Sequence, residues 1–175
     1  MKQEMKELKK IRGIGEVLSR RLVEAGFDTL AKVAALDEET LQKIPGMNPR
    51  ITGSILAHAG ELAAEAERER AAMVKDLQQQ ASSLKVQVQE LARAVRDRFG
   101  GEIGGKDGRK AEKEVLKVIT SLEGVEGIIE TRVNTAGKVL AKTGKRLEGL
   151  ADTGLRGVGK GLKKARKSLQ RALVK

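Results

Sequence analysis

Two short stretches decide the fold of the N-terminal part: residues 8–22 read LKKIRGIGEVLSRRL, and residues 41–55 read LQKIPGMNPRITGSI. The two stretches align at an offset of 33 residues. In each, apolar residues spaced three apart lead into a Gly-apolar-Gly/Asn turn, and a further apolar residue closes the segment. This internal repeat predicts two copies of a unit made of a helix, a tight turn and a second helix.

The two turns have the chemistry of an anion site. Glycine permits a positive φ or a close backbone approach, while Ile14 and Met47 are expected to point into a core. In the second copy, Asn48 is a good helix N-cap and Pro49 suits the first helical position. Free amides and a partial positive charge at a helix N-terminus favour phosphate. The predicted phosphate-binding residues are Gly13, Ile14, Gly15, Gly46, Met47 and Asn48, with Arg12, Lys43 and Arg50 as flanking cations.

A family resemblance covers roughly residues 8–60 and is carried by Gly13-Ile14-Gly15, the segment 22–30, Leu41 and the segment 44–47. There the sequence resembles the helix-hairpin-helix family, and as a tandem pair it is similar to the N-terminal DNA-binding domain of archaeal RadA-type recombinases. The resemblance implies binding of the DNA sugar–phosphate backbone by turn amides, without sequence specificity. Two departures from the family pattern are Asn48 in place of the last glycine and the acid Glu16 beside the first turn.

Composition excludes much enzyme chemistry. No Gly-x4-Gly-Lys-Ser/Thr phosphate-binding loop follows the hairpins, so the chain has no ATPase core of the recombinase kind. The chain has no Cys and only one His, His58, which excludes disulfides, thiolate metal sites, Cys nucleophiles and a His cage within one chain. We therefore expect no catalytic residue, no metal site, no cofactor and no enzymatic activity.

The same composition predicts an all-α fold, because aromatic residues are only 1% of the chain and strand-type alternation is hard to find. Residues 74–95 repeat apolar positions with coiled-coil spacing. This seam predicts either a homo-oligomer or an antiparallel pairing with a later helix of the same chain. The expected parts are a tandem helix-hairpin-helix domain (1–60), a long helix with the heptad seam (61–99), a Gly-rich loop (100–109), a second helix (110–131) and a basic amphipathic tail (132–175).

The tail holds the excess charge. The formal net charge is +11, and residues 132–175 contain thirteen Lys and Arg against two acids. Apolar residues recur there every eleven residues, which places them on one helical face. Seven glycines disfavour an isolated helix, so the tail is expected to fold on a surface. The cations expected to supply electrostatic affinity are Lys138, Lys142, Lys145, Arg146, Lys160, Lys163, Lys164, Lys167 and Arg171.

Three functions remain open from the sequence, one of which is an accessory subunit of a nuclease or recombinase complex that binds DNA only weakly without its partner. The first is an architectural protein that binds double-stranded DNA without sequence specificity, the hairpins contacting phosphates and the tail supplying electrostatic affinity. The alternative is a structural or surface-coating protein whose tail folds on an anionic membrane or in a multimer, with the hairpins as a protein-docking module. The tail's eleven-residue period is similar to that of lipid-surface helices of the apolipoprotein and synuclein type. Without a signal-peptide or membrane-span pattern, we expect a cytoplasmic protein, associated with the nucleoid if it binds DNA.

Overall fold

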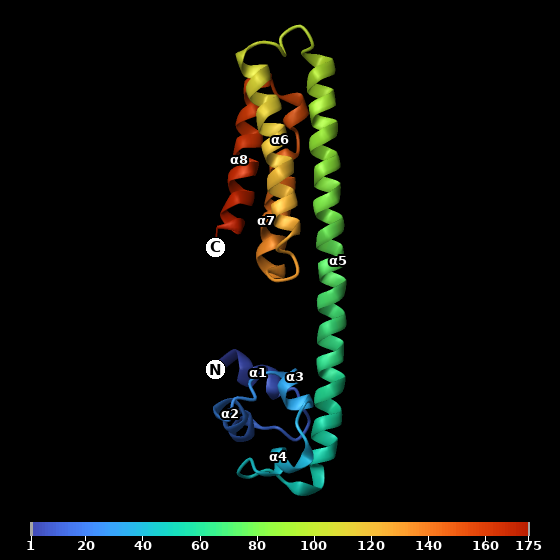
Figure 1. Cartoon of the computed structure of the whole chain (residues 1–175), viewed down its shortest axis with the longest axis vertical. Coiled ribbons are helices and arrows are strands. Elements are labelled where there is room, and N and C mark those ends of the chain that lie inside the picture. The colour runs from blue at the N-terminus through green and yellow to red at the C-terminus, as the bar shows by residue number, and fades with distance from the viewer. Residues whose placement is uncertain (1, 175) are drawn as a thin grey trace. The chain divides into compact units, whose positions relative to one another are not determined.

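A computed structural model describes residues 2–174 and consists of helices and connecting turns throughout that range, with no strand (Figure 1). The all-α prediction is confirmed. The chain divides into two compact units, Met1–Ala71 and Ala72–Lys175, and the long helix α5 (Thr52–Arg98) contributes residues to both. Each unit has its own apolar core.

The N-terminal unit is built from the two predicted hairpins. Its core is formed by ten buried apolar side chains, among them the two turn residues Ile14 and Met47 and the α5 residues Ile55 and Ala59. Because those α5 side chains belong to this core, α5 begins at Thr52, nine residues before the expected start of the long helix. The other elements of the unit are α1 (Lys2–Leu8), α2 (Glu16–Glu24), α3 (Leu30–Ala34), α4 (Glu38–Gln42) and the 3-10 turn η1 (Pro49–Ile51).

Helices pack side by side in the C-terminal unit (Figure 1). They are the α5 residues beyond Ala71, α6 (Lys106–Glu126), α7 (Val133–Leu147) and α8 (Leu155–Leu173), with a 3-10 turn η2 (Leu150–Asp152) before α8. The helix α6 begins inside the expected loop 100–109 because Gly105 takes an extended conformation and serves as its N-cap. Gly124 lies within this helix, which ends at the C-cap Gly127.

The heptad seam of α5 is buried within the chain. Ala81 and Val88 are completely inaccessible, and Leu77, Leu84, Leu91 and Val95 are at most 7% exposed. They belong to one apolar core with residues of α6, α7 and α8. The sequence left open whether this seam pairs with another copy of the chain or with a later helix of the same chain. In the structure it packs against helices of the same chain.

The tail differs from the expected single helix. Gly149, at φ +68°, and the turn η2 reverse the chain between α7 and α8, so the tail forms two helices. Its apolar stripe lies in the core of the unit: Ala136, Leu140, Val158, Leu162 and Leu169 are all at most 1% exposed. The tail does fold on a surface, as the sequence predicts, and α5 and α6 of the same chain supply that surface.

The tail glycines allow close helix packing. A Cβ at Gly137 would lie 3.4 Å from Leu77, and one at Gly144 would lie 3.6 Å from Leu84. The two glycines are seven residues apart, as are the two leucines, so α7 lies along the α5 seam with glycine opposite leucine. The packing contacts offset the low helix propensity of these glycines.

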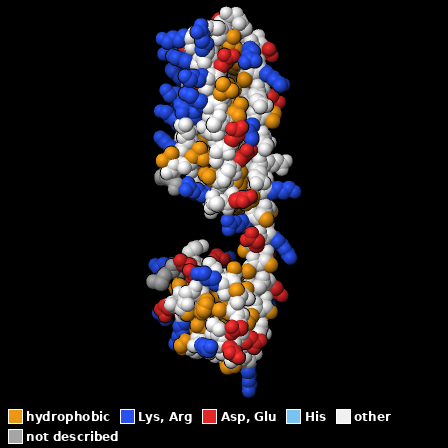
Figure 2. Space-filling model, in the orientation of Figure 1, with side chains coloured by type: hydrophobic (Ala, Val, Ile, Leu, Met, Phe, Trp, Pro, Cys, Tyr) orange, Lys and Arg blue, Asp and Glu red, His pale blue; other side chains and the backbone are white. Residues whose placement is uncertain are grey.

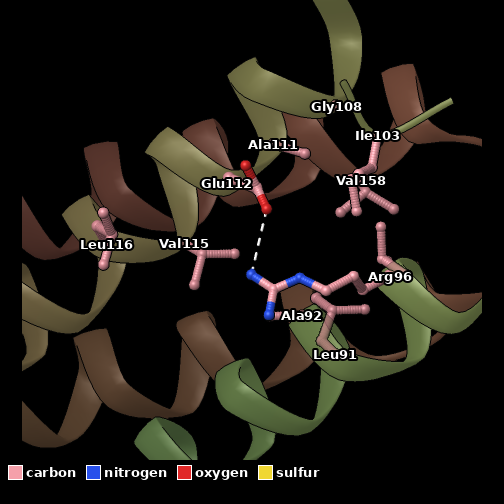
Figure 3. A pocket seen from close by; sticks show the side chains of 11 residues that line it. Leu91, Ala92, Arg96, Ile103, Gly108, Ala111, Glu112, Val115, Leu116 and Val158 are labelled. Atoms are coloured by element: carbon pink, nitrogen blue, oxygen red, sulfur yellow. Dashed lines mark hydrogen bonds and ion pairs between the residues drawn. The ribbon is translucent and has the colours of Figure 1, made fainter. Parts of the chain in front are cut away.

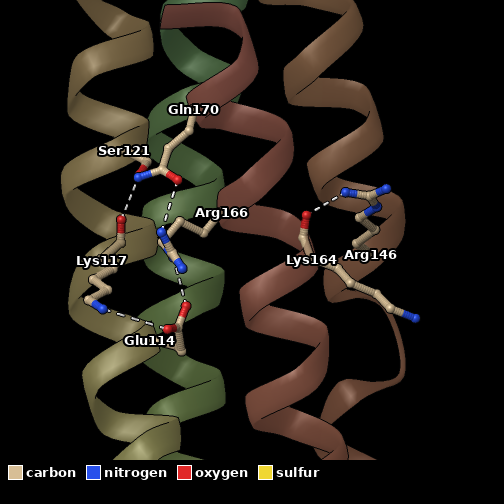
Figure 4. A network of polar contacts seen from close by, with 7 residues as sticks. All are labelled: Glu114, Lys117, Ser121, Arg146, Lys164, Arg166 and Gln170. Carbon is tan, nitrogen blue, oxygen red and sulfur yellow. Dashed lines mark hydrogen bonds and ion pairs between the residues drawn. The ribbon is translucent and has the colours of Figure 1, made fainter. Parts of the chain in front are cut away.

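A polar network fixes α8 on α6 (Figure 4). The guanidinium of Arg166 donates to the Glu114 carboxylate at 2.8 Å and to the Gln170 side-chain oxygen at 2.9 Å, and Lys117 lies 3.8 Å from the same carboxylate. The Arg166 and Glu114 side chains are only 16% and 14% exposed. Removing one member of such a pair leaves the other charge poorly solvated. Loss of either residue should therefore destabilise the contact between α6 and α8.

One cavity of about 240 Å³ remains between α5, the 99–105 loop, α6 and α8 (Figure 3). Its walls are apolar, with Leu91, Val95 and Val115 among them. Arg96 and Glu112 form an ion pair of 3.1 Å at its side, and both side chains are exposed.

The burial of the tail predicts a contrast between two leucine truncations in the C-terminal unit. Leu162→Ala removes a fully buried side chain and should lower the free energy of unfolding by about 2–5 kcal/mol. Leu116→Ala removes a side chain that is 68% exposed, and should change it by no more than about 0.5 kcal/mol. Urea unfolding followed by circular dichroism measures both, and equal small effects would contradict the packing of the tail.

Candidate nucleic-acid interface

The first hairpin turn connects α1 to α2 and leaves the N-terminus of α2 open. Gly13 has φ +91°, a conformation that side chains disfavour, and this turn places Ile14 in the core. Gly15 is the N-cap of α2 and has no side chain to cap the helix. Within residues 2–174, the amides of Glu16 and Val17 have no hydrogen-bond acceptor. These amides are free to bind an anion.

The second hairpin turn has the same backbone shape but satisfies more of its own amides. Gly46 has φ +81°, and Met47 is 8% exposed in the core. The Asn48 side chain accepts from the Arg50 amide at 3.0 Å, and the Asn48 carbonyl accepts from the Ile51 amide at 3.2 Å. The asparagine therefore occupies part of the anion site, and the first turn has the more open helix N-terminus.

The flanking cations are placed as the sequence predicted, on the surface near the turns. The side chains of Arg12, Lys43 and Arg50 are exposed and make no ion pair with a carboxylate in the part of the chain that the structure describes. The acid Glu16 is 72% exposed in its side chain and lies 3.6 Å from Lys9. That lysine offsets part of the repulsion between Glu16 and a phosphate at the first turn.

Two residues outside the predicted site set hold the turns in place. The Arg21 guanidinium on α2 donates to the carbonyl oxygen of Pro45, so it ties the first hairpin to the second turn. The His58 ring on α5 accepts a hydrogen bond of 3.0 Å from the Arg12 backbone amide through Nδ1. His58 is half-buried, and its bond to a turn 46 residues away had no signal in the sequence.

Three ionisable groups of this unit have shifted pKa values, and each shift comes from a local structural contact. The hydrogen bond from Lys10 to Glu7 raises the pKa of the lysine, and the hydrogen bond from Lys32 lowers the pKa of Asp28. The Thr40 backbone amide, which donates to the Asp37 side chain at the start of α4, lowers the pKa of Asp37. These contacts stabilise the helices that carry the turns.

The second candidate surface is the outer side of α7 and α8. The apolar stripes of these helices face the core. On the outer side, Lys and Arg recur at spacings of three, four and seven residues. Figure 2 shows these side chains gathered along the edge of the unit where α8 lies in Figure 1. The exposed cations, here called the basic face, are Lys138, Lys142, Lys145, Arg156, Lys160, Lys163, Lys164, Lys167 and Arg171.

The structure changes the predicted set at one position and adds another. Arg146 is half-buried and donates to the Lys164 carbonyl (Figure 4) and to the Ser168 hydroxyl, so it joins α7 to α8 rather than facing solvent. Arg156, one turn before Lys160, is exposed and was not predicted. No side chain of the basic face pairs with a carboxylate within residues 2–174.

A hydrogen-exchange measurement tests the bond between His58 and the first turn. His58→Leu removes the acceptor, and a net contribution of about 1 kcal/mol predicts that the Arg12 amide exchanges about five-fold faster. His58→Asn places an acceptor oxygen near the position of Nδ1 and should restore slow exchange. Equal exchange rates in the wild type and the leucine variant would show that the bond does not protect the turn.

Comparisons with known proteins agree with the geometry of the N-terminal unit. Residues 5–61 match the family model described as a SAM-like helix-hairpin-helix tandem. Comparisons with curated proteins and with solved structures returned no match, so the finer likeness to archaeal recombinases stays a prediction. Among residues 2–174, no helix is long and apolar enough to cross a membrane, and no three His, Cys, Asp or Glu side chains gather as metal ligands would. Helix-hairpin-helix domains commonly bind DNA without sequence specificity, and residues 5–61 of this chain match the model of such a domain.

Proposed function

We propose that this protein is an architectural DNA-binding protein, without enzymatic activity, that holds double-stranded DNA by its sugar–phosphate backbone. The observation that carries the proposal is the basic face, nine exposed cations without carboxylate partners, in the same chain as a tandem helix-hairpin-helix domain. Lys and Arg that neutralise phosphates release counterions and provide affinity that does not depend on sequence. The hairpin turns add amide contacts to the same chemical group.

The choice of duplex over single strands follows from the side chains present. Proteins that hold single strands stack the bases on aromatic rings. The only aromatic residues are Phe27 and Phe99, and both are half-buried. The basic face therefore suits a backbone rather than exposed bases.

The choice of DNA over a membrane follows from the position of the apolar stripe. An amphipathic helix binds a membrane by burying its apolar face in the interface. In α7 and α8 that face lies in the core of the C-terminal unit. An anionic vesicle would meet the cations alone unless the unit opened.

Salt dependence of binding tests the role of the basic face. Replacing Lys138, Lys142, Lys160, Lys163 and Lys167 by Gln removes five cations and should reduce the slope of log K against log salt by about 4 to 5. The matched control replaces five lysines elsewhere, Lys6, Lys10, Lys75, Lys110 and Lys113, by Gln and should change the slope by much less. Fluorescence anisotropy with one labelled duplex over about 50–300 mM salt measures the slopes. Equal slopes in both variants would contradict the assignment.

A substitution at Gly15 tests the first turn without disturbing the fold. Nothing lies within 4 Å of a Cβ at this position, and its φ of −88° suits any residue. Gly15→Asp should cap α2 and leave the melting temperature unchanged or higher, while its carboxylate repels phosphate and weakens duplex binding several-fold. Gly15→Ala lacks the carboxylate and should bind as the wild type does. Equal affinity of the two variants would exclude phosphate contact at the first turn.

A further inference from the structure

The two candidate surfaces belong to units with different charge. Residues 1–71 contain twelve Lys and Arg and twelve Asp and Glu, whereas residues 72–175 contain twenty-three and twelve. The whole net charge of +11 therefore belongs to the C-terminal unit. The hairpin turns bind through amides with a few cations beside them, and the basic face binds through charge. Their contacts with DNA must differ in salt dependence.

The basic face is large enough to occupy a duplex segment by itself. The helix α8 has 19 residues, so it is about 28 Å long at ~1.5 Å per residue. That length corresponds to about 8 base pairs at ~3.4 Å per pair. Nine cations on α7 and α8 can neutralise the phosphates that one side of such a segment presents. A duplex segment held there has no need of the hairpin turns.

The shape of the hairpin turns does not depend on the basic face. Their core, which includes Ile14, Leu22, Met47 and Ile55, is closed within the N-terminal unit. The contacts that hold the turns, from Arg21 to Pro45 and from Arg12 to His58, lie within the same unit. Each surface is thus built by a unit with its own core.

We propose that the chain has two separate duplex sites, one at the hairpin turns and one on the basic face, and that it links two DNA duplexes. This inference rests on the proposed function and deepens it. One site is held mainly by charge and the other mainly by backbone amides, so the two sites lose affinity at different salt concentrations. Linkage requires both sites, and each site alone supports ordinary binding.

Counting short duplexes on the full chain gives the first test. A duplex of about 12 base pairs fills one site, so the wild type should bind two per chain at ~50 mM salt, measured by sedimentation of the complex. Gly15→Asp with Asn48→Asp should bind one, with a steep salt dependence. The variant with five lysines of the basic face replaced by Gln should bind one, with a shallow salt dependence. A single duplex per wild-type chain would overturn the inference while leaving the proposed function intact.

Linkage itself gives the second test. A duplex of about 60 base pairs is fixed to a surface, the protein is added, and a second labelled duplex of the same length is captured. The wild type should capture at least five times more label than either site variant. Capture that survives the hairpin substitutions would arise from self-association through the basic face and would overturn the inference, as would absence of capture by a wild type that binds two short duplexes.

Failure of the proposed function looks different from either result. In that case the wild type binds neither short nor long duplexes, and the lysine replacements change nothing. The Leu116→Ala chain, whose exposed side chain belongs to neither site, serves as the folded control in both experiments. Its stoichiometry and capture should equal those of the wild type.

Discussion

The burial of the tail's apolar stripe against α5 and α6 is the interaction on which the rest of the C-terminal unit depends. Leu162, Leu169 and Val158 are completely or almost completely inaccessible, and they share a core with the α5 seam. Once these side chains face inward, helical geometry turns most of the Lys and Arg of α7 and α8 to the outside. The same packing that stabilises the fold thus creates the basic face.

Much of the architecture could be predicted from the sequence because it follows from local patterns. The paired turns at Gly13 and Gly46 were visible as a repeat, and both residues have the positive φ that glycine favours. The apolar positions of the eleven-residue period lie in the core, except Ala151 and Leu173, which are exposed. What the stripe packs against could not be read from it, because an amphipathic pattern identifies the buried face but not the partner. The reversal at Gly149 was missed since its glycine was one of seven in the tail.

Only part of the candidate site could be predicted from the sequence. The predicted turn residues do lie in the two turns. The structural roles of Arg21 and His58 were not predicted, because their contacts join segments 24 and 46 residues apart. Arg146 was assigned to the solvent-facing set although it borders the stripe at Leu147. Arg156 belongs to the solvent-facing set in its place, because it lies one turn before Lys160 on the same side of α8 and is exposed.

The reversal at Gly149 has a thermodynamic consequence. It places two rows of like charge, one on α7 and one on α8, on one surface, whereas a single straight helix would have spread them along a line. Mutual repulsion among nine cations opposes the compact state of this unit. Salt screens that repulsion, and a bound polyanion neutralises it and adds its own binding free energy to folding. Under the proposed function, the unit gains stability when it binds DNA, and its folding and its occupancy are coupled equilibria.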